Sequence, residues 1–420
     1  MTPNNLPQLT SKKLLKRDAE IANLHQLLQQ NHQVVIAGDS GTGKTTLVLQ
    51  YAHEYLDYYP QGICWIFANC GDQVGQIIQF TQTYLKIPPV NNNALILTEG
   101  CLIILDDVTY LSQIQAYLST QSANFKLLIT TRFPELITPD ITLDILEEKT
   151  ALELLKLNVG LSRMKNTQGK GFNVKLSQES LGEKICDQLE YLPFNIQLAG
   201  KYLQYKPKLS LEKFHQELQA NNLLELGWLS LNETAKELSC ILSLFAICPV
   251  PWGQVESVLG QLYLPAAMME KLLEGKSQNS DQDIEKILKE YLQKWQKAKD
   301  DLLKLNWLHE LNKDVFISNN KIRSYCLLKL LITDSENNLK NAFTDVMIAV
   351  AKQIPATTND EIITQIAPAI PHVIELATTW NNYISSENLT LLYNGIGRFY
   401  QSQGLEQLAS TWFAKNSPIE

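Results

Sequence analysis

The sequence lacks the features that mark membrane-spanning proteins, secreted proteins and proteins that bind bulk DNA. Its most apolar stretch, residues 241–250, is too short to span a bilayer and is typical of a buried helix. Residues 1–18 contain no apolar core followed by a small-residue cleavage site, so we expect no signal peptide. An excess of positive charge is also missing, because the formal net charge is -8 and the pI is about 5.4. This acidity opposes binding to anionic membranes and to bulk DNA, and we expect neither as a partner.

Cysteine is sparse and shows no pattern of metal binding or of disulfide pairing. The chain has 7 cysteines, an odd number, and none of them forms a C-x-x-C pair. Several lie inside apolar runs, which is typical of small buried hydrophobic residues in a reducing compartment. We therefore expect a cytoplasmic protein.

The overall composition is typical of a globular protein, with 45% hydrophobic and 19% charged residues. At 420 residues the chain is long enough for about two to four domains. From residue 33 short apolar segments alternate with helical ones, which predicts a parallel sheet covered by helices. The predicted strands are residues 33–37, 63–68, 101–105, 125–130 and 141–146. Ligands of such sheets bind beyond the carboxyl ends of the strands, so the residues that follow each strand are the informative ones.

The strongest motif follows the first strand and reads Gly38-Asp39-Ser40-Gly41-Thr42-Gly43-Lys44-Thr45-Thr46. It fits G-x-x-x-x-G-K-[ST], the phosphate-binding P-loop, and the required strand precedes it and the required helix follows it. Glycines let the backbone wrap closely around a phosphate, and the helix N-terminus adds partial positive charge. We predict that the loop binds a nucleoside di- or triphosphate. Lys44 is expected to reach the β- and γ-phosphates and to take part in catalysis, and the Thr45 hydroxyl to ligate Mg²⁺.

Two further motifs follow later strands. Residues 101–105 run into Asp106 and Asp107, an apolar strand ending in acid, which is the Walker-B pattern. We assign Asp106 to Mg²⁺ and Asp107 to orienting or polarising a water molecule. The next strand runs into Thr130-Thr131-Arg132, where Arg132 is placed to contact the γ-phosphate; a solvated surface arginine is the alternative interpretation.

Taken together, the P-loop, Leu105-Asp106-Asp107-Val108 and Thr130-Thr131-Arg132 resemble an NB-ARC domain, which belongs to the STAND class of signal-transduction NTPases. The pair Arg17-Asp18 resembles the Gly-Arg-Glu motif at the entry of such domains, with Lys16 in place of glycine. The resemblance implies that Arg17 lies against the adenine and ribose of the nucleotide.

A second part of the resemblance lies in a helical segment. Residues Tyr191-Leu192-Pro193-Phe194 resemble the Gly-Leu-Pro-Leu motif of the NB-ARC lid, with Tyr191 in place of glycine and Phe194 in place of leucine. The resemblance implies that Pro193 packs against the base. Taken alone, the residues indicate only a proline near a helix N-terminus.

The third part is a segment of helices followed by a hairpin, which suits a winged helix. We predict helices at residues 237–247 and 284–305, a polar loop at 274–283, and a hairpin over 307–317. The family ends this hairpin with Met-His-Asp, whose histidine contacts the β-phosphate of ADP. Ser318-Asn319-Asn320 stand there instead, so the resemblance gives Asn319 that nucleotide-binding position without the histidine's charge.

The C-terminal segment is helical and contains one match to the tetratricopeptide pattern. Tyr393, Ile396, Gly397 and Tyr400 are followed by Ala409 and Phe413 at the expected spacing. A single repeat cannot bury its own core. We therefore expect that it packs on the helices before it, or that the chain is a shortened relative of a longer repeat protein.

These patterns predict an α/β and then mostly α architecture: a P-loop NTPase parallel sheet, a helical lid, a winged-helix domain and a short C-terminal helical segment with a TPR-like repeat. The predicted divisions are a flexible N-terminus at 1–13, a nucleotide-binding domain at 14–147, a lid at 148–225, a winged helix at 226–333 and a helical region at 334–420.

The function that the resemblance implies is an ATP/ADP-dependent switch with Mg²⁺ that controls protein–protein assembly. ADP would hold the domains closed, and ATP would favour an open form that self-associates or binds a protein partner. We expect a slow Mg²⁺-dependent ATPase at most. Two alternatives stay open: a winged-helix transcription regulator gated by nucleotide, and a scaffold that binds nucleotide without hydrolysing it. Lysines in residues 284–305 favour the regulator, but interleaved acidic residues suit a solvated helix face.

Overall fold

The structure is a computed structural model that describes residues 2–8, 17–86, 100–110, 125–159, 172–264, 282–355 and 360–416, without the side chains of 172–179, 282–287 and 360. Lys16 and most of the predicted loop at 274–283 lie outside the described residues.

A five-stranded parallel sheet forms the N-terminal part of the molecule, with the strand order β2-β3-β4-β1-β5. Its strands are β1 (Gln33–Ala37), β2 (Gly62–Phe67), β3 (Cys101–Val108), β4 (Lys126–Thr131) and β5 (Ile141–Thr142). The predicted strands are confirmed, but β5 is shorter than expected. Its pairing with β1 ends at Ala37 and Thr142, where β1 gives way to the glycine loop.

Helices cover both faces of this sheet because successive side chains of each strand point to opposite faces. Val34 and Ile36 of β1 pack with α1 (Asp18–Gln30) and α2 (Lys44–Glu54), whereas Val35 packs on the other face with α3 (Gln73–Thr83). A short 3₁₀ helix, η1 (Leu56–Tyr58), follows α2.

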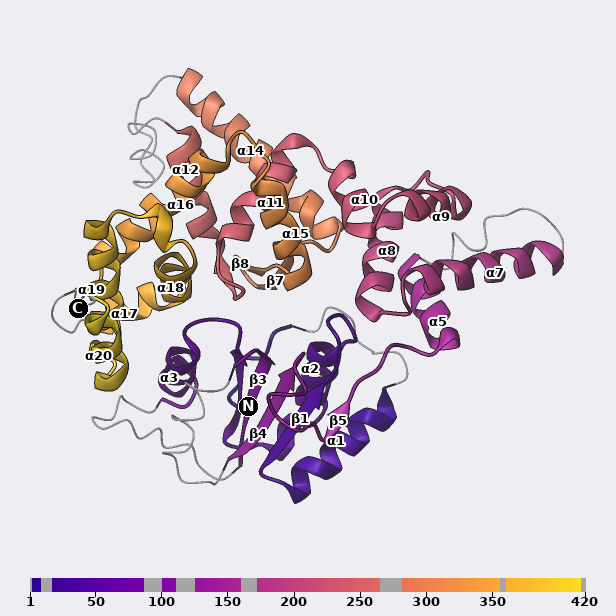
Figure 1. Ribbon diagram of the computed structural model, residues 1–420, viewed down its shortest axis with the longest axis horizontal. Coiled ribbons are helices and arrows are strands. Elements are labelled where there is room, and N and C mark those ends of the chain that lie inside the picture. Colours follow the sequence, from indigo (N-terminus) through magenta and orange to yellow (C-terminus); the bar gives the residue numbers. More distant parts are fainter. Residues whose placement is uncertain are drawn as a thin grey trace.

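A group of helices follows the sheet, on the right in Figure 1. They are α5 (Glu148–Val159), α7 (Phe172–Gln188), α8 (Pro193–Tyr205), α9 (Leu211–Ala220) and α10 (Leu223–Ser230). The turn between α7 and α8 is tight, because Glu190 and Tyr191 both have left-handed backbones with φ of 59° and 53°. Tyr191 therefore adopts a conformation that glycine reaches without steric cost.

The next part combines helices with a small antiparallel sheet of order β6-β8-β7. Its elements are α11 (Glu233–Leu244), β6 (Val250–Pro251), α12 (Trp252–Tyr263), α14 (Gln282–Lys304), β7 (His309–Asn312), β8 (Val315–Ile317) and α15 (Asn320–Leu330). The predicted hairpin is confirmed as β7 and β8, and the predicted long helix as α14.

The C-terminal helices pack on this part and on one another. They are α16 (Glu336–Lys352), α17 (Asp360–Ile366), η2 (Ala367–Ala369), α18 (Ile370–Thr379), η3 (Asn381–Tyr383), α19 (Ser386–Ser402) and α20 (Glu406–Ala414). The segment with the tetratricopeptide-like spacing forms α19 and α20. It packs on α16 and α18, in agreement with the expectation that it packs on the helices before it. Gly397 lies so close to α20 that an added Cβ would stand 2.4 Å from the Phe413 ring.

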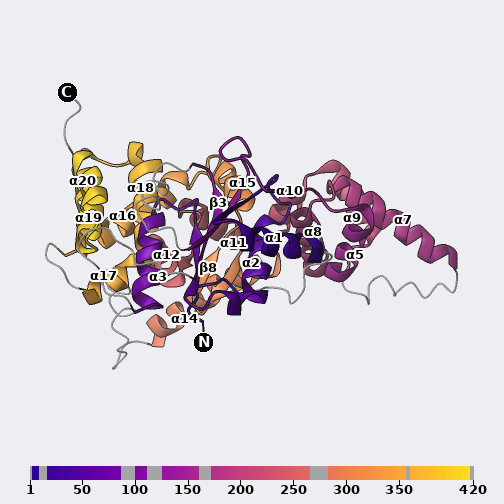
Figure 2. The same cartoon turned by 90° about the horizontal axis from the view of Figure 1, so that it is seen from below.

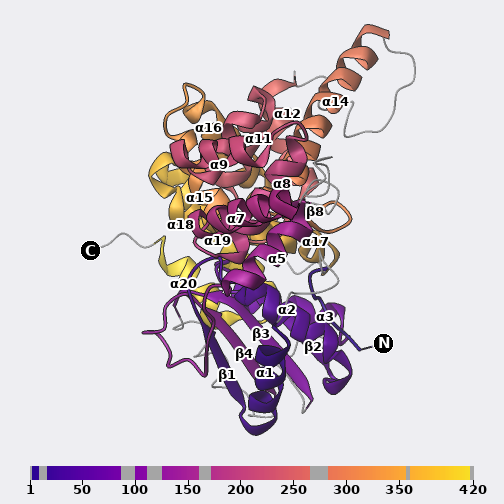
Figure 3. The same cartoon turned by 90° about the vertical axis from the view of Figure 1, so that its right-hand side faces the viewer.

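Figures 1 and 3 show the five-stranded sheet on one side of the molecule and α11 to α16 on the other. Seen from below, α7 and α20 lie toward opposite ends with the sheet between them (Figure 2). One apolar core runs from Val74 and Leu146 to Trp412, through the middle and C-terminal helices. Within the described residues, no helix is both long enough and apolar enough to cross a membrane.

Candidate functional site

The loop between β1 and α2 is shaped by its glycines. Gly38, Gly41 and Gly43 have φ of 154°, 96° and 97°, in the region that other residues rarely adopt. A Cβ added to Gly38 would lie 2.4 Å from the carbonyl oxygen of Leu143, which follows β5, so no larger residue fits there. The loop therefore lies close against the end of the sheet.

The loop presents hydrogen-bond donors toward its own centre. Lys44 Nζ donates to the carbonyl oxygens of Gly38, at 2.6 Å, and Asp39, at 2.9 Å. Thr42 Oγ1 also donates to the Asp39 carbonyl. Among the described residues, the backbone N–H groups of Gly41 and of residues 43–45 have no hydrogen-bond acceptor. Such amides at a helix N-terminus form an anion-binding site.

Asp106 lies at the end of β3, 7% exposed, and two hydroxyl groups converge on it. Thr45 Oγ1 and Thr130 Oγ1 both donate to Asp106 Oδ1, at 2.9 and 2.8 Å. Burial raises the pKa of the Asp106 carboxyl to about 6, and these hydrogen bonds oppose the shift. The Thr45 hydroxyl and the Asp106 carboxylate are hard oxygen donors of the kind that Mg²⁺ takes, and they fit the predicted metal position.

Among the described residues, no group of three or more His, Cys, Asp or Glu side chains could hold a metal ion by itself. A Mg²⁺ ion at Thr45 and Asp106 would therefore need ligands from a bound phosphate and from water, which is how this ion is commonly held.

Asp107 has a strained backbone and a carboxylate that is already engaged. Its φ is 63°, the ladder between β3 and β4 is irregular at this point, and its N–H donates to Thr130 Oγ1 at 2.7 Å. Arg132 Nε donates to Asp107 Oδ1 at 2.7 Å, and Asn69 Nδ2 donates to the other oxygen. Burial lowers the pKa of Lys44, and Arg132 is close enough to lower it further. The Arg132 guanidinium is nevertheless paired with Asp107, and its contact with a γ-phosphate stays a prediction.

Arg132 also reaches the first residue of α15. With the Asn320 amide oriented so that its oxygen faces the guanidinium, that oxygen accepts from Nη2 at 2.8 Å and from Nη1 at 3.2 Å. Thr130, Asn69 and Asn320 were not among the site residues predicted from the sequence. Thr130 could have been found, because it belongs to the Thr-Thr-Arg motif; nothing in the sequence indicated the other two.

The start of α8 touches the loop. The Phe194 N–H donates to the Gly41 carbonyl at 3.2 Å, and a Cβ on Gly43 would lie 3.9 Å from Pro193 Cγ. Pro193 therefore lies beside the phosphate-binding segment. Its contact with a base stays a prediction.

In the segment after the hairpin, the nucleotide contact of Asn319 stays a prediction, and a second residue lies at the loop. Asn319 is the N-cap of α15, and its Oδ1 accepts from the Lys321 N–H at 2.9 Å. It is Lys321 that reaches the loop: its Nζ would lie 3.2 Å from a Cβ on Gly41. Lys321 was not predicted as a site residue, although it is a cation only two positions beyond Asn319.

Arg17 ties α1 to the segment after β5. Its Nη1 donates to Glu20 at 2.6 Å and its Nη2 to the Asp144 carbonyl at 2.8 Å. These contacts do not include a loop residue, and the adenine-side position of Arg17 stays a prediction.

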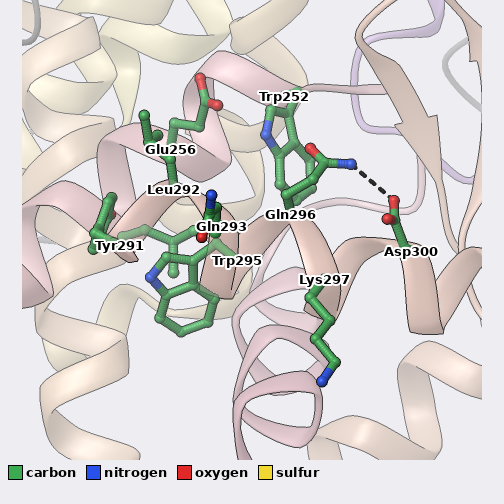
Figure 4. Close-up of a pocket in the computed structure, with 10 residues that line it drawn as sticks. Trp252, Glu256, Tyr291, Leu292, Gln293, Trp295, Gln296, Lys297 and Asp300 are labelled. Atoms are coloured by element: carbon green, nitrogen blue, oxygen red, sulfur yellow. Dashed lines mark hydrogen bonds between the residues drawn. The ribbon is translucent and has the colours of Figure 1, made fainter. Parts of the chain in front are cut away.

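A pocket of about 460 Å³ lies elsewhere, on α12 and α14 (Figure 4). It is lined by Trp252, Glu256, Leu259, Tyr291, Leu292, Gln293, Trp295, Gln296, Lys297 and Asp300. Gln296 donates to Asp300 at its rim. None of the predicted site residues lines this pocket.

No protein-family model and no curated protein matches the chain. Similar solved structures include a Walker-type ATPase of Pyrococcus abyssi, with 13% identity, a TM-score of 0.35, and coverage of 77% of this chain and 99% of the other. Cdc6p of Pyrobaculum aerophilum is similar with 14% identity, a TM-score of 0.32, and coverage of 77% and 97%. At these values neither likeness bears on what this chain does.

Proposed function

We propose that this chain binds ATP or ADP at residues 38–46 and acts as a nucleotide-dependent switch of the NB-ARC type. The observation that supports nucleotide binding is the loop itself. Three glycines hold it in a conformation whose amide N–H groups have no acceptor among the residues that the structure describes, and Lys44 lies inside it. A phosphate chain supplies the acceptors that these donors lack.

Thr45 and Asp106 would hold the Mg²⁺ ion, which neutralises charge on the bound phosphates. Thr130 keeps the Asp106 carboxylate in place through its buried hydroxyl. The aligned hydroxyl and carboxylate support a metal site that forms together with the nucleotide.

Switching is proposed from what lies against the loop. Phe194 of α8 and Lys321 of α15 both approach Gly41, although they come from distant parts of the chain. A nucleotide there can shift the arrangement of these parts only by its differential affinity for the two arrangements. We propose 14–147, 148–225, 226–333 and 334–420 as the moving units, the third a winged helix and the last with a TPR-like repeat, and a protein partner or a second copy as the target of the open form.

Hydrolysis is proposed to be slow. Asp107, the candidate to orient water, forms an ion pair with Arg132, so its carboxylate is not free for that role in this arrangement. The same observation favours the second candidate, a scaffold that binds nucleotide without hydrolysing it. Asp107 becomes available only if Arg132 turns toward a bound phosphate.

The test is to denature freshly purified protein and identify the nucleotide that is released. ADP in near-stoichiometric amount supports a switch held in its resting form, and turnover of added ATP then separates the switch from the scaffold. A protein that releases no nucleotide, and binds neither ATP nor ADP when they are added with Mg²⁺, rules out the proposal.

A further inference from the structure

We propose that Lys321 is a phosphate ligand of the nucleotide site, supplied by α15 across the junction between two parts of the chain. This inference rests on the proposed function, and it names a residue that the motifs do not. The ligand is the terminal phosphate of ADP, or the corresponding β-phosphate of ATP.

The position of Lys321 over the loop carries the inference. Its Nζ would lie 3.2 Å from a Cβ on Gly41, in the middle of the phosphate-binding segment. The backbone N–H of Gly41 is one of the loop amides that have no acceptor among the described residues. The ammonium thus lies beside a loop residue whose own N–H has no acceptor among the described residues.

The charged groups around Lys321 leave its ammonium without a hydrogen-bonded partner among the described residues. Burial lowers the pKa of Lys321, Arg132 lowers it further, and the carboxylates of Glu190 and Asp39 oppose both effects. A half-buried ammonium that no carboxylate contacts is electrostatically costly, and a bound phosphate removes that cost.

The simpler interpretation is a lysine that packs along an apolar surface. Its Nζ does lie 5.6 Å from the centre of the Phe194 ring, which is a cation–π distance. Such packing would serve the junction with or without phosphate. The two interpretations differ in one measurable respect: only a phosphate ligand changes the preference for ADP over AMP.

The helix that carries Lys321 is held in place. Asn319 caps it, Arg323 Nε donates to the Phe245 carbonyl at 2.8 Å, and Arg323 Nη2 donates to Glu375 at 2.6 Å. These contacts tie α15 to the end of α11 and to α18, so the three are expected to move together. The contact of Lys321 with a phosphate would couple nucleotide binding to the position of the whole C-terminal half.

The experiment measures ADP and AMP affinities by calorimetry, with Mg²⁺, on nucleotide-free full-length protein. Lys321→Met keeps the stem over Phe194 and removes the charge, Lys321→Arg keeps a cation, and Lys313→Met removes a charge from the exposed turn between β7 and β8. We expect Lys321→Met to reduce the ADP-to-AMP affinity ratio at least about tenfold, since hydrogen bonds between charged groups are worth that much. The ratio of Lys321→Arg should stay within about threefold of the wild-type ratio, and the ratio of Lys313→Met should equal that of the wild type.

An unchanged ADP-to-AMP ratio in Lys321→Met overturns the inference and leaves the proposed function standing. An equal loss for both nucleotides also overturns it, because that result indicates packing alone. If the wild-type protein binds neither nucleotide, the proposed function fails first and the inference fails with it.

Discussion

Two regions border the phosphate loop, and they are built differently. At the ends of β3 and β4, Asp106, Asp107 and Thr130 are joined by hydrogen bonds within one sheet. At the start of α15, Lys321 approaches the same loop at Gly41, and Asn320 meets the Arg132 guanidinium beside it, both through the ends of their side chains. The first region is held by strand pairing within the sheet. The second exists only while two distant parts of the molecule lie together, which is what a switch needs.

The largest effect on function is expected inside the first region. Lys44→Ala removes the charge at the centre of the loop and should weaken ADP binding by about a hundredfold or more. Calorimetry with Mg²⁺ measures this. Lys313→Ala, in an exposed turn, is the matched control, and equal affinities of the two variants would contradict the assignment of the loop.

The hydrogen bond between Asp72 and Tyr400 also joins distant parts of the chain, and it should make the stability of the protein depend on pH. Asp72 is 4% exposed, its carboxylate accepts from the Tyr400 hydroxyl at 2.6 Å, and Cys70 and Cys248 are its titratable neighbours. Burial raises the pKa of Asp72 to about 7. A raised carboxyl pKa gives stability that is complete below the unfolded pKa of about 4 and is lost as pH rises through 7.

The expected loss from Asp72 between pH 5 and 8 is about 2–3 kcal/mol, at about 1.4 kcal/mol for each pKa unit. Asp72→Asn keeps the acceptor oxygen and cannot ionise, so its stability relative to wild type should rise by that amount over this range. Urea unfolding at both pH values measures the difference. Parallel pH profiles of the two proteins would contradict the raised pKa of Asp72, because they would mean that its carboxyl is already ionised in the folded state at pH 5.

Thr130→Val tests the hydrogen bonds of the first region. It removes the hydroxyl that donates to Asp106 and accepts from the Asp107 N–H, and it leaves that part-buried N–H without its partner. We expect a loss of about 2 kcal/mol in unfolding free energy. Thr142→Val, on an exposed position of β5, is the control and should change stability by less than about 0.5 kcal/mol.

Asn320→Ala tests the second region in the same assay. It removes the amide that meets the Arg132 guanidinium, while the Arg132–Asp107 pair stays intact. Because these groups are part-exposed, we expect a loss of about 1 kcal/mol or less. A loss of unfolding free energy larger than that of Thr130→Val would contradict this, because the α15 contact would then contribute more to stability than the hydrogen bonds at the strand ends.

The first region could be predicted from the sequence because its signals are local. The loop, Asp106 and Arg132 each follow a strand that its own apolar residues specify, and parallel pairing brings strand ends together. Hairpin β7–β8 was predictable for the same reason.

The second region could not be predicted, because it depends on how α8 and α15 fold back onto a loop more than a hundred residues earlier. The sequence pointed to Asn319, whose Oδ1 caps α15 and whose contact with a phosphate stays a prediction, whereas the contacts of Asn320 with Arg132 and of Lys321 with Gly41 had no signal of their own. The contact between Asp72 and Tyr400 spans 328 positions, and neither the residues around Asp72 nor those around Tyr400 indicate it. Long-range side-chain contacts are set by packing, which single-sequence patterns do not encode.

The central claim is that one nucleotide contacts both regions at once. Hydrogen–deuterium exchange of the wild-type protein, with and without ADP and Mg²⁺, tests it most directly. The account predicts slower exchange both at residues 38–46 and at residues 318–324 when ADP is bound. Protection confined to residues 38–46 would contradict it, because the nucleotide would then bind the loop without engaging α15.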